Sequence, residues 1–95
     1  MKLSDLTVED AARYAVLTED DPDAALFPHY LEAAKQYVLS YTGLTLEKAD
    51  LLPDLSLAAL VLFADMTRNK EATVASDKAN QVLQSILGMY SVNLL

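Results

Sequence analysis

The sequence predicts an all-α fold, a small bundle of about four helices with short connections and an apolar C-terminal tail. In several segments apolar residues recur at steps of three and four, which is the periodicity of a helix. No segment alternates between polar and apolar residues as a half-buried strand does. Apolar residues make up 53% of the chain and only two residues are glycine, so a single domain over residues 1–95 can bury a modest core.

Two helices are predicted in the first half of the chain. Thr7 reads as the N-cap of a helix with acids in its first turn, and this helix runs to about Leu17. The second helix ends near Thr42, followed by glycine at the position where helices often terminate. Pro28 lacks an amide hydrogen and must lie in its first turn, so the helix begins near Ala25 or an earlier turn is kinked; we favour the later start. Its apolar stripe comprises Leu26, Tyr30, Ala33, Ala34, Tyr37, Val38 and Tyr41.

The third helix is the most apolar part of the chain. Residues 45–50 predict one short helical turn, and Pro53 then leads into a helix over residues 55–69. Ser56 is the only polar residue between Leu55 and Ala64. A helix that is apolar on every side must be buried on every side, in the core of a monomer or in an oligomer. Three amphipathic neighbours could scarcely cover it, which favours self-association.

The end of the chain combines a polar loop, a helix and an apolar tail. Residues 70–77 predict a loop, after which Ser76, Asp77 or Asn80 could cap a fourth helix that ends near Gly88. The tail over residues 91–95 is apolar, whereas chain ends are usually polar. It either folds back on its own core or inserts into a neighbour. The apolar face of the fourth helix comprises Val82, Leu83, Ile86, Leu87 and Tyr90.

The net charge of −7 is divided unevenly. Residues 1–54 hold 11 of the 14 acids and 4 of the 7 bases, whereas residues 55–95 hold three of each and are neutral. A strongly acidic domain is a poor nucleic-acid binder, because phosphates require a positive field. The neutral, apolar half is better suited to protein contacts. The longest apolar run, over residues 57–64, is too short to span a bilayer, so we expect no membrane association.

Residues that could carry chemistry are few, and we expect neither catalysis nor a cofactor. The chain has no cysteine, and His29 is its only histidine, as expected of a surface residue rather than a metal ligand. Oxygens of the acidic turn could bind a cation. A solvated turn that caps the second helix is favoured instead, so no metal is expected. The acidic turn comprises Glu19, Asp20, Asp21 and Asp23.

For the tyrosines of the second helix, too, a structural role is favoured over a functional one. The tyrosines of the second helix could stack on nucleic-acid bases, but that helix offers only Lys35 as a positive charge. We therefore expect these rings in the core with their hydroxyls at its rim. Asp65 and Arg68 either face water or pair with each other or across a subunit boundary.

The order and spacing of these features resemble the phage head–tail connector (head-completion adaptor) family. The resemblance covers most of the chain. It rests on Asp20-Asp21-Pro22-Asp23, Ala34-Lys35 followed by Tyr37, Ser40-Tyr41-Thr42-Gly43-Leu44-Thr45, Asp54-Leu55-Ser56, Asp65-Met66, Arg68-Asn69 and the closing segment from Ile86 to Leu95.

The resemblance implies a structural role without catalysis. Such proteins are small helical bundles that assemble into a ring, commonly of about a dozen copies, beneath the portal protein. The ring extends the DNA channel and receives the next neck or tail-completion protein, and DNA passes through without specific binding. It also implies a place at the head–tail junction of the virion, after assembly in the cytoplasm of the host bacterium.

The same resemblance assigns roles to residues. The third helix would supply the core and subunit contacts, while loops and the C-terminal segment would meet portal or neck proteins. The expected interface residues are Leu57, Leu60, Val61, Asp65, Arg68, Tyr90, Val92, Asn93, Leu94 and Leu95.

The acidic turn could face the channel and repel phosphates, although it could equally face outward. Reversing the charges of Glu19, Asp20 and Asp21 is expected to impair DNA packaging, and unchanged infectivity would count against the channel-facing role.

Two other functions are compatible with the residues alone. The first is a small acidic helical protein that regulates a single protein partner as a monomer or dimer. The second is a helix-turn-helix DNA-binding protein, which the negative charge and the lack of a basic recognition helix make the weakest.

Overall fold

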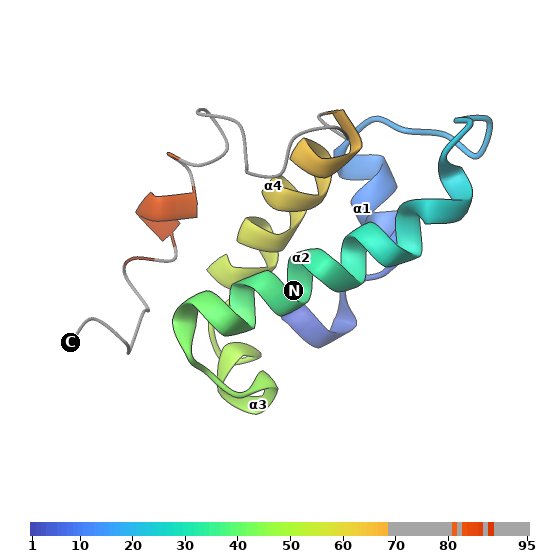
Figure 1. Cartoon of the computed structure of the whole chain (residues 1–95). Helices are drawn as coiled ribbons and strands as arrows, with labels where there is room; N and C mark the ends of the chain where they lie inside the picture. Colours follow the sequence, from blue (N-terminus) through green and yellow to red (C-terminus); the bar gives the residue numbers. More distant parts are fainter. Residues whose placement is uncertain (69–80, 82, 87, 89–95) are drawn as a thin grey trace.

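The computed structural model describes residues 1–68, 81, 83–86 and 88, and these residues form helices and turns with no strand among them. The predicted all-α fold is confirmed. Figure 1 shows α2 running past both α1 and α4. The helices are α1 (Val8–Tyr14), α2 (Phe27–Thr42), α3 (Leu46–Ala49) and α4 (Asp54–Arg68), with two 3-10 turns, η1 (Leu3–Asp5) and η2 (Ala24–Leu26).

Helix α1 begins at a capping box, as the predicted N-cap requires. The Thr7 hydroxyl accepts a hydrogen bond from the amide of Asp10 at 3.2 Å, and the Asp10 carboxylate accepts one from the amide of Thr7 at 3.1 Å. These bonds satisfy amides that the first turn of a helix leaves unpaired. Hydrogen bonding by Thr7, chiefly from its amide, also holds the pKa of Asp10 below its usual value, because it favours the charged carboxylate.

The end of α1 corrects the prediction that this helix reaches about Leu17. Its last helical residue is Tyr14. The amide of Leu17 donates to the carbonyl oxygen of Ala12 at 2.8 Å, and that of Val16 donates to Arg13 at 3.2 Å. This pair of bonds is the Schellman motif, which needs a left-handed residue between helix and loop. Val16 supplies it with a φ of 59°. Because glycine usually fills that position, a valine there does not indicate the end of a helix.

Replacing Val16 with glycine is expected to stabilise the fold. A β-branched residue is strained at positive φ, and 86% of the Val16 side chain is exposed, so little packing is lost. Relief of about 1–2 kcal/mol of strain, less the greater unfolded-state entropy of glycine, leaves a net gain of about 1 kcal/mol. The midpoint temperature of thermal unfolding should therefore rise by roughly 4–8 °C. A Val16→Ala variant is the control, and an equal gain with alanine would contradict the argument from left-handed strain.

Helix α2 matches the prediction at both ends. Pro28 lies in its first turn, and the 3-10 turn η2 precedes it directly. At the other end Gly43 adopts a φ of 72°, and its amide donates to the carbonyl oxygen of Leu39 at 2.9 Å. The buried hydroxyl of Thr42 donates to the carbonyl oxygen of Val38 at 2.9 Å. The only polar residue on the buried stripe of α2 is thus paired within its own helix.

A clamp joins the start of the chain to α3. Thr45 caps α3 through its hydroxyl, which accepts from the amide of Lys48 at 3.3 Å, so the predicted short turn over residues 45–50 is confirmed. Asp50 follows this helix, and its carboxylate accepts two hydrogen bonds from η1. The donors are the amide and the hydroxyl of Ser4, at 2.9 and 2.6 Å. The clamp thus connects residues that are 46 positions apart.

The clamp between Ser4 and Asp50 makes the stability of the fold depend on pH. The hydrogen bonds from the hydroxyl and amide of Ser4 lower the pKa of Asp50 below its ordinary value of 3.8. A lowered pKa contributes stability above the unfolded value, and that contribution is lost as the pH falls through the folded value. Asp50→Asn should therefore lower the thermal midpoint at pH 7, and the difference from wild type should shrink below about pH 4. Thermal scans from pH 7 to pH 2 measure this, with Glu47→Gln as the exposed-acid control. A difference that stays constant over that range would count against the clamp.

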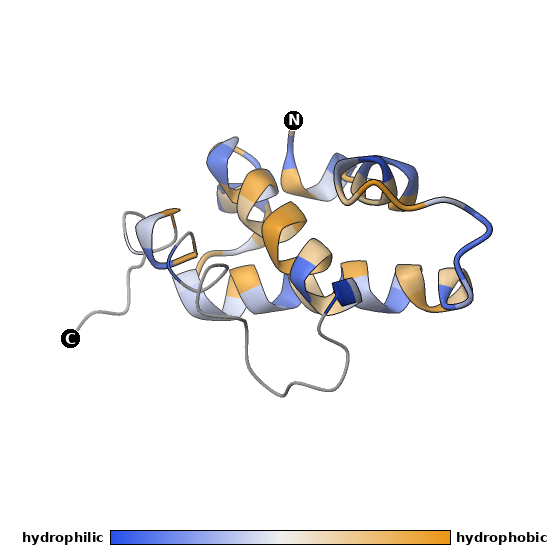
Figure 2. Cartoon of the chain, turned by 90° about the horizontal axis from the view of Figure 1, so that it is seen from above, coloured by the Kyte–Doolittle hydropathy of each residue, from blue (hydrophilic) through white to orange (hydrophobic). Residues whose placement is uncertain are grey.

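The core lies mainly between α2 and α4, the pair of helices with the most extensive contact. In Figure 2 the largely apolar ribbon of α4 lies between α2 and the N-terminal elements. Small side chains let the helix backbones approach closely. The buried alanines are Ala11, Ala15, Ala34, Ala49, Ala58, Ala59 and Ala64.

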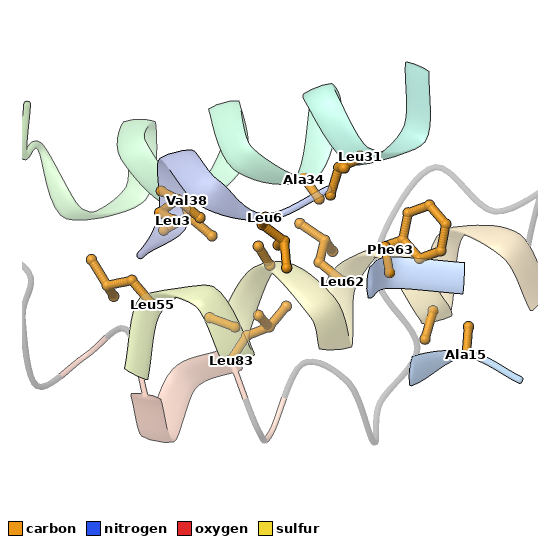
Figure 3. Close-up of a cluster of buried hydrophobic side chains, with 14 of the residues drawn as sticks. Leu3, Leu6, Ala15, Leu31, Ala34, Val38, Leu55, Leu62, Phe63 and Leu83 are labelled. Carbon is orange, nitrogen blue, oxygen red and sulfur yellow. The ribbon is translucent and has the colours of Figure 1, made fainter. Parts of the chain in front are cut away.

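Large side chains fill the spaces that the alanines leave. Phe63 is fully buried, and its ring meets that of Phe27 edge to face, with 5.9 Å between the centroids. Leu3 and Leu6, from and beside η1, join the same cluster (Figure 3). The Nζ of Lys35 donates to the carbonyl oxygen of Leu6 at 2.8 Å and so fixes this N-terminal segment to α2.

The two buried polar side chains of α4, Ser56 and Thr67, hydrogen-bond to nearby backbone carbonyl groups. The hydroxyl of Ser56 donates to the carbonyl oxygen of Pro53 at 2.8 Å, and that of Thr67 donates to Ala64 at 2.8 Å. Among the described residues, no buried side-chain nitrogen or oxygen is left without a hydrogen-bond partner. Burial of α4 in the core therefore leaves none of its buried side-chain nitrogen or oxygen atoms without a hydrogen-bond partner.

The C-terminal predictions are tested only in part. Residues 81 and 83–86 are helical, Leu83 is buried in the core and Ile86 is half-buried, as expected for the apolar face of the fourth helix. The loop over residues 70–77 and the proposed caps lie outside the described residues. So do Asn69, Val82, Leu87 and the tail over residues 91–95.

Candidate functional site

One face of α4 remains partly open, in line with the argument that the neighbours in so small a bundle could scarcely cover a helix that is apolar all round. The side chain of Leu57 is 42% exposed, and those of Leu60 and Val61 are half-buried. These three residues, here the α4 stripe, stand three and four positions apart and therefore share one face of the helix. The opposite face packs on α2. Neighbours in this small bundle thus cover most of α4 and leave the stripe as partly exposed apolar surface.

The other expected interface residues are distributed differently. Asp65 is half-buried, and Arg68 is exposed at the end of the described helix. Pairing of these two side chains, one of the two alternatives that the sequence left open, stays a prediction. The remaining expected interface residues, Tyr90, Val92, Asn93, Leu94 and Leu95, lie outside the described part of the chain.

The acidic turn is built from local hydrogen bonds. The carboxylate of Asp21 accepts from the amide of Asp23 at 2.8 Å, and the hydroxyl of Thr18 accepts from the amide of Asp20 at 3.3 Å. Asp21 and Asp23 are half-buried, while Glu19 and Asp20 are exposed. The turn leads directly into η2, where the amide of Leu26 donates to the carbonyl oxygen of Asp23 at 2.8 Å. In the described residues, no group of three carboxylate, imidazole or thiol side chains is placed to hold a metal ion.

The tyrosines of α2 differ from the prediction. Tyr30 is half-buried, but Tyr37 and Tyr41 are 41% and 40% exposed, so the expected core position is wrong for these two. The buried stripe of α2 consists of residues 27, 31, 34, 38 and 42. Tyr37 and Tyr41 each precede a stripe residue, so they are rotated away from the stripe around the helix axis. Their rings stack on each other with 6.2 Å between the centroids. His29 is exposed, as expected.

An apolar groove, here the α1 groove, opens between α1 and the start of α2. Its volume is about 510 Å³. The charged residues at this groove, Glu9, Arg13 and Glu19, are all exposed. The groove also adjoins the left-handed Val16 through Leu17. Periodicity in the sequence did not predict this feature, because it forms only once the acidic turn brings η2 back against α1. Its other lining residues are Val8, Ala12, Leu17, Thr18, Ala24 and Phe27.

The arrangement offers surfaces for protein contact. Two apolar features, the α4 stripe and the α1 groove, lie on different elements and share no residue. Apolar surface that folding leaves open commonly marks an interaction site. None of the helices in the described part of the chain is long and apolar enough to cross a membrane.

Comparison of the chain with protein families, with curated proteins and with solved structures found no match.

Proposed function

We propose that this chain is a structural subunit of the head–tail connector ring of a phage or prophage. In that role it extends the portal channel and docks a neck or tail-completion protein. The observation that carries the proposal is the order and spacing of features along the chain. An acidic turn is followed by a helix ending in Tyr41-Thr42-Gly43, then by the apolar α4 and an apolar tail.

The open face of α4 supports a role in assembly. A subunit of a ring must keep apolar surface after it folds, because burial of that surface drives association. The α4 stripe is such a surface, with Leu57 at 42% exposure. It also lies within residues 55–95, which hold three acids and three bases, so that this part of the chain carries no net charge.

The acidic half supports a role beside DNA that must slide. Glu19 and Asp20 are exposed in the loop before α2. A surface of this sign repels phosphates and so does not hold the passing genome. We propose that the acidic turn faces the channel in the assembled ring.

Native mass spectrometry over a wide concentration range tests the ring. A closed species of about a dozen copies is the expected result, since heterologous contacts that close make rings of fixed size. Leu57→Glu should weaken the assembly, because it places a charge on the α4 stripe. Leu51→Glu makes the same change at a leucine that is 78% exposed outside α4, and it should leave the assembly intact.

Other masses would point elsewhere. A strict dimer at every concentration would favour the alternative, a small acidic protein that regulates one protein partner. A monomer at every concentration would leave binding to a portal protein as the deciding measurement.

A further inference from the structure

We infer that residues 2–6, here the arm, exchange between neighbouring copies, so that the arm of one copy is held by the next. Within a chain the arm is held by a site on α2, α3 and α4, here the socket. The polar groups of the socket are Asp50 and Lys35, and its apolar part is the core cluster that Leu3 and Leu6 join (Figure 3). The exchange rests on the proposed function, because a ring sets identical copies side by side, and it goes beyond that function by naming the segment that passes between them.

The groups that hold the arm are distant from it in the sequence. The amide and the hydroxyl of Ser4 donate to the carboxylate of Asp50, which is 46 positions away. The Nζ of Lys35 donates to the carbonyl oxygen of Leu6, which is 29 positions away. Leu3 is fully buried, and its turn η1 contacts α3 and α4. Because α2, α3 and α4 supply these contacts, the socket of one copy offers the same contacts to the arm of another.

The arm holds its own shape. The amide of Asp5 donates to the carbonyl oxygen of Lys2 at 3.1 Å, and that of Leu6 donates to the carbonyl oxygen of Leu3 at 3.3 Å. Each bond joins residues three positions apart, as in a 3-10 helix, so both of its partners belong to the arm. The arm can therefore leave one socket and enter another with these bonds intact.

The joint between the arm and α1 is short. Leu6 has a φ of −70° and a ψ of 119°, and Thr7 has a φ of −100° and a ψ of 165°, so both are extended. The capping box of Thr7 and Asp10 begins α1 without any group from the arm. A rotation at Leu6 thus redirects the arm and leaves the cap closed. Exchange of an identical element costs little in contacts, because those of the closed chain are remade in the next copy, and short joints favour it.

Charge is compatible with the arm of a second copy. The arm has one base, Lys2, and one acid, Asp5, so its side chains are neutral overall and the rest of the chain carries the net charge of −7. The hydrogen bonds from Ser4, and then the positive charges of Lys2 and Lys35, lower the pKa of Asp50. Whole copies repel each other because both are acidic. Exchange is therefore expected at high local concentration and not in dilute solution.

Disulfide trapping tests the exchange, because the chain has no cysteine of its own. A chain with Ser4→Cys and Asp50→Cys is oxidised with glutathione disulfide, once in dilute solution and once at high concentration. The two side chains are hydrogen-bonded, so a seated arm brings the two cysteines together. The expected product in dilute solution is a monomer with an internal disulfide. At high concentration we expect disulfide-linked oligomers, at least several-fold more abundant than in a control chain with Ser4→Cys and Glu32→Cys. That control also removes one exposed acid.

A second pair keeps the Asp50 carboxylate in place. Glu47 is exposed and lies three positions before Asp50 in the short helix α3. Ser4→Cys with Glu47→Cys, joined by a short bismaleimide, replaces the first pair if circular dichroism shows that the first chain is unfolded. The same pattern of internal and intermolecular products is expected.

The outcomes separate the exchange from the ring itself. An internal cross-link alone at every concentration overturns the exchange. If wild type still forms a closed species by native mass spectrometry, the ring then stands on another contact. A ladder of linked oligomers together with a closed species supports both the exchange and the ring. A linked dimer as the only oligomer, with no larger closed species, supports the exchange and overturns the ring.

Discussion

Replacing Phe63 with alanine is expected to destabilise the fold by about 3–5 kcal/mol, the cost typical of removing a buried aromatic ring. The side chain is fully buried, and its ring packs edge to face on Phe27. Its removal takes away the burial of the ring and leaves a space that surrounding side chains fill only in part. A domain of this size has a total stability of roughly 5–15 kcal/mol, so the variant should lie near the limit of folding. Urea denaturation followed by circular dichroism measures the change.

The control for Phe63 is a large apolar residue at the surface. Leu51→Ala removes a side chain that is 78% exposed and should change stability by less than about 0.5 kcal/mol. A double-mutant cycle with Phe27→Ala isolates the ring pair, which is expected to contribute about 0.5–1.5 kcal/mol beyond area burial. A loss below about 1 kcal/mol for Phe63→Ala would show that the core between α2 and α4 is not packed as described.

Replacing Leu3 with alanine is expected to cost about 2–5 kcal/mol, although this residue stands in a short 3-10 turn near the start of the sequence. Leu3 is fully buried and belongs to the cluster between α2 and α4. Two hydrogen bonds from Ser4 to Asp50 hold its turn in place. The same truncation in a frayed chain end would change almost nothing. Thermal and urea denaturation therefore distinguish an anchored segment from a loose one.

Two neighbouring changes sharpen the test of Leu3. Lys2→Ala alters an exposed side chain in the same segment and should be nearly neutral. Leu46→Ala removes a leucine that is 44% exposed in another short helical element, so it should cost clearly less than Leu3→Ala. Equal effects at Leu3 and Leu46 would contradict the anchoring of η1.

Local chemistry accounts for the parts of the fold that could be predicted. Thr7 and Thr45 are strong N-cap residues, and Gly43 supplies a left-handed residue without strain, so these boundaries lie where the sequence placed them. Val16 also adopts a left-handed backbone conformation, although valine disfavours it, and no residue nearby in the sequence indicates it. The turn η1 was missed for a related reason. Three residues with one leucine have no periodicity, and the turn is stabilised by residues distant in the sequence, among them Asp50.

The sequence indicated which residues form the candidate site, but not which way their side chains face. The apolar character of α4 pointed to the stripe residues, and the spacing of Leu57 and Val61 put them on one face. Periodicity gives the angle of a side chain around its helix, but it does not say on which side a neighbour lies. For that reason the expected core position of Tyr37 was wrong, and the sequence did not say which face of α4 stays open. The α1 groove depends on two elements meeting, so no single segment encodes it.

The hydrogen bonds between Ser4 and Asp50 have a consequence for synthesis on the ribosome. Ser4 is made 46 residues before its partner. At the usual 5–20 residues per second, this interval lasts about 2–9 s. Through all of it Leu3 has neither α3 to hold its turn nor α4 to cover it. Leu3 therefore joins the core only after the middle of the chain has been made, and its turn reaches its native place only after the later helices exist.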